Sequence, residues 1–134
     1  MSRNKHGWWQ YAKYMIRAYP EHCSELIAIH EQSTTAAYSG MPGSHSAQRT
    51  VEDISIRELP RNAQREYDAV KRAIESTSRK ADGAERLRLI DMVFWRQTHT
   101  INGAALVLHI SERTAREWHR MFIWAVAENY GLAD

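Results

Sequence analysis

The sequence predicts an all-α fold, and two observations support this prediction. Apolar residues recur every three or four positions in several segments, which is the spacing of a buried helix face. No segment shows the apolar–polar alternation of a half-buried strand, and no internal repeat is visible. We therefore expect an N-terminal helical hairpin followed by a helical bundle that contains a helix-turn-helix.

Composition excludes several classes of protein. The chain has 134 residues, 43% hydrophobic and 25% charged, which is typical of a folded soluble protein. No apolar run is long enough to cross a membrane, and the N-terminal MSRNKHGWWQ lacks an apolar signal core. We therefore expect a cytoplasmic location. The single Cys23 excludes an internal disulfide and a zinc site built on several cysteines.

The first third of the chain is expected to form two parts. We expect residues 1–32 to form an aromatic helical hairpin, with its first helix over Gly7–Tyr19. The second helix should start at Pro20, since proline suits a first helical turn. Residues 33–53 predict a flexible linker, because Ser33–Thr50 is rich in Ser, Thr, Gly and Ala. Residues 54–134 are then expected to form a helical domain.

Two further helices are expected before the helix-turn-helix. One runs from about Pro60 to Ser76, and its expected buried face comprises Ala63, Tyr67, Val70 and Ile74. Another begins after Asp82 and Glu85, whose spacing resembles a capping box. This second helix is apolar nearly all round, so we expect it to be the central buried helix.

The segment from Thr100 to Met121 reads TINGAALVLHISERTAREWHRM, which has the spacing of a helix-turn-helix within residues 100–129. Small residues fall where two steeply crossed helices touch, and larger apolar residues fall beside the crossing: Ala104, Ala105 and Ala115, then Leu108, Ile110 and Trp118. Ser111 precedes the second helix as a cap. His109 occupies the turn position often taken by Gly, so a positive φ there would carry strain.

The outer face of the second helix, Ser111–Asn129, suggests contact with DNA. Arg113, Arg116 and Arg120 form one stripe, opposite the apolar Ala115, Trp118 and Phe122. Arginine reads guanine edges and binds phosphates. The alternative for such a stripe is a solvated face on an ordinary core helix. The expected DNA contacts are Thr100, Ser111, Arg113, Thr114, Arg116, Glu117 and Arg120. Among them Arg113 and Arg116 are the expected base readers, and Thr100, Ser111 and Arg120 the expected phosphate contacts.

The end of the last helix is apolar on several sides. The helix should stop near Gly131. Trp124 lies on the same side as the arginine stripe and so needs a partner. The N-terminal hairpin, a second subunit and RNA polymerase are the candidates, and burial within the chain is favoured because aromatic stripes more often belong to a core.

The C-terminal half resembles the RinA-like phage transcriptional activators, a family close to the ArpU-like regulators. The resemblance lies in AIESTSRK at 73–80, ISERTAR at 110–116 and AVAENYG at 125–131, and it covers roughly residues 60–131. The arrangement is also similar to the fourth region of bacterial sigma factors, in which a helix-turn-helix grips a promoter element. The resemblance implies a phage or prophage regulator that activates late genes, with double-stranded DNA as its ligand.

Two other classes of function stay open. A terminase small subunit would use the same helix-turn-helix for DNA packaging and would assemble into a ring. An enzyme is disfavoured, because no catalytic signature or phosphate loop stands out. His22, Cys23 and His30 share one helix, but the two histidines are about two turns apart, so we expect no metal site. We also expect no cofactor, and the sequence leaves a homodimer and a complex with RNA polymerase open.

Overall fold

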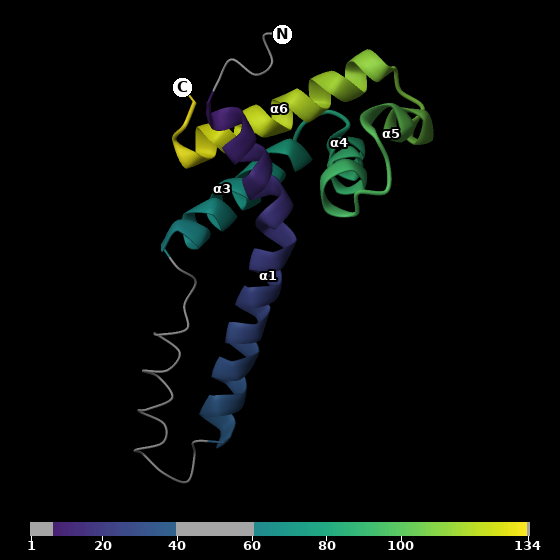
Figure 1. The fold of residues 1–134 in the computed structure, drawn as a ribbon. Coiled ribbons are helices and arrows are strands. Elements are labelled where there is room, and N and C mark those ends of the chain that lie inside the picture. Colours follow the sequence, from purple (N-terminus) through teal and green to yellow (C-terminus); the bar gives the residue numbers. More distant parts are fainter. Residues whose placement is uncertain (1–6, 40–60, 134) are drawn as a thin grey trace. The chain divides into compact units, whose positions relative to one another are not determined.

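The computed structural model describes residues 7–39 and 61–133, and every regular element among them is helical (Figure 1). The all-α prediction is therefore confirmed. The elements are α1 (Trp8–Ser39), α3 (Arg61–Ser78), α4 (Gly83–Ile90), the π-helical turn η2 (Asp91–Trp95), α5 (Ile101–Leu108) and α6 (Glu112–Tyr130). The described residues fall into two compact units, one within Met1–Tyr19 and Arg65–Asp134 and the other within Pro20–Gln64.

The predicted break at Tyr19–Pro20 is wrong, because α1 is one helix with Pro20 in its interior. A proline has no backbone N–H, so it leaves the carbonyl four residues earlier without its helical partner. That carbonyl belongs to Ile16, and the indole Nε1 of Trp95 donates to it at 2.8 Å. A side chain from η2 thus replaces the hydrogen bond that proline removes.

The predicted linker is also shorter than expected at its start. Residues 33–39 continue α1, since no Gly or Pro interrupts the chain before Gly40. The remainder of the linker, residues 40–53, lies outside the described residues.

The larger of two cores joins α1, α3, η2 and α6. Its fully buried members include Met15 and Ile16 of α1, Val70 of α3, and Ile123 and Val126 of α6. The N-terminal aromatic segment is therefore part of the same core as the C-terminal helix.

The buried face of α3 is rotated from the predicted one. Val70 is buried as expected, but Tyr67 and Ile74 are only half-buried. Ala69 and Ala73 occupy the core beside it instead, because small side chains let neighbouring helices approach closely. Tyr67 forms the border of this core, where its ring stacks on Tyr19 at 5.4 Å between centroids.

The smaller core lies beneath α5 and the first half of α6. It contains the three alanines predicted at the helix crossing together with larger apolar side chains: Leu89, Met92, Ala104, Ala105, Leu108, Ala115 and Trp118. Leu89 and Met92 face this core, whereas Ile90 and Phe94 face the larger one. The α4–η2 segment is therefore shared by both cores, as expected of a central helix.

The predicted capping box of α4 does not form. Asp82 has left-handed backbone angles, with φ 58°, and its side chain makes no capping hydrogen bond. The reason is the tight approach of Gly83 to the end of α3: a Cβ on Gly83 would lie 2.6 Å from the Ser78 carbonyl oxygen. The chain thus enters α4 through a turn that only glycine permits at this point, and this turn sets the Asp82 backbone.

Candidate nucleic-acid interface

A short connection joins α5 to α6 (Figure 1). Backbone hydrogen bonds fix its geometry. His109 ends α5 with φ 59°, so the strain considered for a positive φ at this position applies. The His109 N–H donates to Leu106 at 3.3 Å and the Ile110 N–H donates to Ala105 at 3.0 Å, which is the Schellman pattern of helix termination. The turn therefore orients α6 relative to α5 without a glycine.

Both helices begin with a side-chain cap, of which the one at Ser111 was predicted and the one at Thr100 was not. Ser111 accepts from the Thr114 N–H at 3.0 Å and also bonds the Thr114 hydroxyl at 2.8 Å. Thr100 accepts from the Gly103 N–H at 3.0 Å. Each cap satisfies a free N–H group of a first helical turn. These contacts give Thr100, Ser111 and Thr114 structural roles in addition to the DNA contacts predicted for them.

The apolar side of α6 is buried, as predicted. Ala115, Trp118 and Phe122 are 0%, 7% and 2% exposed. Arg113, Arg116, Glu117 and Arg120 are all exposed. The two faces of the helix therefore separate as the sequence pattern indicates, and the predicted arginine stripe lies on the surface.

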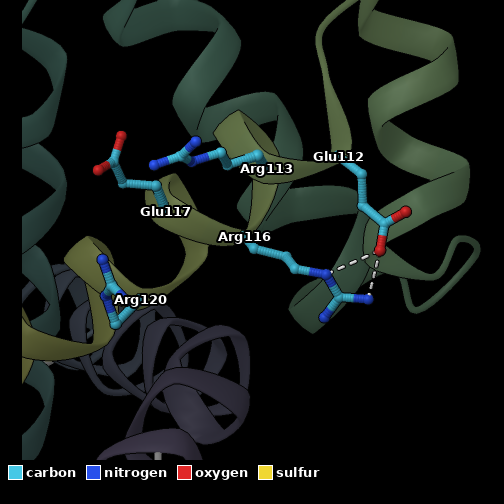
Figure 2. A pocket seen from close by; sticks show the side chains of 5 residues that line it. All are labelled: Glu112, Arg113, Arg116, Glu117 and Arg120. Atoms are coloured by element: carbon cyan, nitrogen blue, oxygen red, sulfur yellow. Dashed lines mark hydrogen bonds and ion pairs between the residues drawn. The ribbon is translucent and has the colours of Figure 1, made fainter.

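Five charged side chains make up this outer face: Glu112, Arg113, Arg116, Glu117 and Arg120 (Figure 2). They border an open hollow of about 480 Å³. All five come from one helix, so the hollow is the space between splayed side chains and not an enclosed site. Such a surface suits a large flat or grooved partner better than a small molecule.

Arg116 differs from the other two arginines because it is already paired. Its Nε and Nη2 lie 2.8 and 2.6 Å from Oε2 of Glu112, one turn earlier (Figure 2). Both side chains are exposed, so the pair contributes at most about 1 kcal/mol to stability. Arg113 and Arg120 form no ion pair with any described residue. Their guanidinium groups therefore need not break an ion pair before they bind a partner.

A set of residues that was not predicted from the sequence borders this face. His119 stacks on Phe94 with centroids 5.0 Å apart and planes 4° apart. The guanidinium of Arg17 lies over the same Phe94 ring at 5.9 Å. Burial, followed by the charges of Lys13, Arg116 and Arg17, lowers the pKa of His119 to about 4. The first third of α1 thus brings two cations close to the outer face of α6.

Lys13 and Arg17 carry a weak signal in the sequence. Their spacing of four residues places them on one face of α1. The aromatic residues around them hide that signal, because they are the stronger indication of a buried helix. Only the packing of α1 against α6 shows that the two basic residues belong beside the arginine stripe.

Trp124 finds its partner inside the chain. Its ring meets that of Trp8 edge-on, with centroids 5.0 Å apart. This contact agrees with the prediction that the aromatic surface of the last helix is covered by the same chain.

Helix α6 ends in a second Schellman pattern at Gly131, where φ is 97° and the Leu132 N–H donates to the Ala127 carbonyl at 2.8 Å.

A second polar cluster lies away from the arginine stripe. The Tyr11 hydroxyl donates to the buried Glu66 carboxylate and lies 3.2 Å from the Tyr130 hydroxyl. Burial, followed by the hydrogen bond to Glu66, raises the pKa of Tyr11 well above its ordinary value. The phenol therefore stays protonated and links α1, α3 and α6.

The described residues offer neither a metal site nor a membrane-spanning helix. They bring together no group of three side chains that could hold a metal ion. None of the described helices has the length and apolarity needed to cross a bilayer. The arginine face of α6 is thus the most developed candidate surface in the described part of the chain.

Comparison with known proteins adds no family to this picture: no family model, no curated protein and no solved structure matches the chain.

Proposed function

We propose that the protein is a sequence-specific, non-enzymatic DNA-binding regulator in which α6 enters the major groove. The observation that carries this proposal is the exposed stripe of Arg113, Arg116 and Arg120 on a capped helix whose opposite side is buried. An α-helix fits the major groove, and the residues near its N-terminus reach the base edges. The short turn after α5 supports the same function, because it holds the helix firmly on the domain.

The three arginines have different roles in this proposal. Arg113 is near the helix start and unpaired, so it is the first base reader. Arg116 must exchange its ion pair with Glu112 for a hydrogen bond to DNA. The freed carboxylate of Glu112 then faces the groove, where it can accept a hydrogen bond from the N4 amino group of cytosine. Arg120 lies two turns from the start and binds a phosphate. Glu117 lies between them on the same surface and adds a second acceptor.

The resemblance of residues 60–131 to the RinA-like phage activators supports a finer proposal. We propose that the regulator activates late genes of a phage or prophage, by holding RNA polymerase of the bacterial host at their promoters. Transcription from such a promoter by purified polymerase should rise when the protein is added. A fall in transcript at the same protein concentration would make it a repressor.

The DNA-binding proposal is tested with fragments from the protein's own genomic neighbourhood, in competition with unrelated DNA. One fragment should stay bound at physiological salt. Arg113→Ala should cost about 1–3 kcal/mol on that fragment and relax the base preference at one position. Arg72→Ala on α3 is the matched control, since it removes the same charge from another exposed helix position.

Two results would overturn the proposal. One is binding that is weak, blind to sequence and lost as salt rises, which would favour a packaging or protein-interaction role. The other is an Arg113→Ala variant with unchanged affinity and unchanged base preference. A thermal unfolding curve for each variant shows that the fold is intact before the binding data are compared.

A further inference from the structure

Lys13 and Arg17 place positive charge on α1 beside the outer face of α6. The Phe94 ring connects the two helices, because the Arg17 guanidinium lies over it at 5.9 Å and the His119 ring stacks on it at 5.0 Å. Arg116 is one turn before His119 on α6. Cations from two segments more than 90 residues apart in sequence thus belong to one surface.

This surface is electrostatically unbalanced. Neither Lys13 nor Arg17 forms an ion pair with a described residue, and Arg17 is exposed. Partial burial, followed by the charge of Arg17, lowers the pKa of Lys13. Like charges held together cost free energy in the unbound protein, and an anion placed against them relieves that cost.

We propose that Lys13 and Arg17 bind the phosphate backbone of the same DNA duplex that α6 reads. This inference rests on the proposed function and extends it to a second element. A helix lying in the major groove has a phosphate strand on each side, and more than half of protein–DNA hydrogen bonds go to phosphates and sugars. Cations on one side of α6 therefore lie close to the phosphates of the DNA strand on that side.

The role of this pair differs from that of Arg113. Phosphates are the same at every sequence, so α1 contributes affinity and orientation but no base preference. His119 stays neutral above about pH 5, since its pKa is about 4, and so adds no charge to the pair at physiological pH. The contact should therefore depend on salt and hardly on pH between 6 and 8.

The test compares wild-type protein with Lys13→Gln/Arg17→Gln on specific and unrelated DNA across a salt series. Each phosphate contact contributes a slope of about 0.9 in log K against log salt, so losing two should reduce the slope by about 2. Affinity should fall by a similar factor on both DNAs, which leaves the ratio between them unchanged. Arg17→Lys should retain most of the slope, because it keeps the charge.

Lys71→Gln/Arg72→Gln is the matched control, because it removes one lysine and one arginine from the exposed side of α3. It should leave the slope unchanged. If wild-type protein binds a specific fragment but the α1 variant shows an unchanged slope, this inference is wrong while the proposed function stands. If the wild-type protein binds no DNA specifically, both are wrong. A specificity ratio that falls with the α1 variant would also overturn the phosphate role, since it would show base reading.

Discussion

His109 occupies the left-handed region of backbone conformation without being a glycine. Its φ of 59° costs an ordinary residue about 1–2 kcal/mol, because Cβ approaches the backbone carbonyl. The side chain is exposed and makes no hydrogen bond with a described residue. The strain therefore comes from the turn itself, because the Schellman pattern at the end of α5 requires a left-handed residue at this position.

This strain predicts the sign of two substitutions. His109→Gly should raise the free energy of unfolding by up to about 1 kcal/mol, since relief of strain exceeds the extra entropy that glycine has when unfolded. Gly131→Ala, at φ 97°, should lower it by about 1 kcal/mol for the opposite reason. Urea unfolding measures both. A destabilised His109→Gly variant would show that the imidazole makes a stabilising contact.

At the scale of elements, α1 passes through Pro20 because another element supplies the missing hydrogen bond. Trp95 donates to the Ile16 carbonyl at 2.8 Å, and the ring of Trp95 also packs on the core that α1 helps to form. Helix α1 therefore depends on a residue that lies 79 positions later in the chain.

Trp95→Phe should lower the free energy of unfolding by about 1–3 kcal/mol, part of it from an unsatisfied carbonyl. Pro20→Ala restores an N–H at position 20, so the same Trp95→Phe change should cost about 1 kcal/mol less in that background. Chemical denaturation of the four proteins of this double-mutant cycle gives the coupling directly, and the lost ring volume cancels. Equal costs in both backgrounds would show that the indole does not replace the helical hydrogen bond.

These elements also show where sequence reasoning succeeds. The cap at Ser111, the end of α6 at Gly131 and the burial of Trp118 follow from residues close together in the chain, so the sequence predicts them. The continuity of α1, the backbone at Asp82 and the proximity of Lys13 to α6 depend on partners far away or on close backbone approach. Periodicity carries no information on such partners, and so the hairpin and the capping box were predicted in error.

At the scale of the whole molecule, α6 serves two cores. Ala115 and Trp118 belong to the smaller core, while Phe122, Ile123 and Val126 belong to the larger. His119 lies at the junction, stacked on Phe94 and largely buried among cations from α1 and α6. Protonation of the His119 ring therefore affects the packing of α1 and α6 at this junction.

The pKa of His119 predicts a pH dependence of stability. The pKa is about 4 in the folded protein and 6.5 ordinarily, so the unfolded chain binds more protons between these values. The contribution of His119 to stability is fully present above pH 6.5 and is lost as the pH drops to 4 and below, by roughly 3 kcal/mol. The difference in unfolding free energy between wild type and His119→Phe, measured from pH 7 to pH 4, isolates this contribution from that of the carboxylates.

His109→Asn is the control for this measurement, since asparagine tolerates the left-handed backbone and the substitution removes an exposed histidine. Its pH profile should follow that of the wild type. If His119→Phe loses stability in acid as steeply as wild type does, the buried imidazole is not the group responsible.

The separation of the two faces of α6 also has an evolutionary consequence. None of Glu112, Arg113, Arg116, Glu117 and Arg120 is buried in either core, and the helix is held by its caps and by the residues on its other side. Exchange of these five side chains should leave both cores intact. Mutations can therefore change what this face binds without passing through an unstable intermediate.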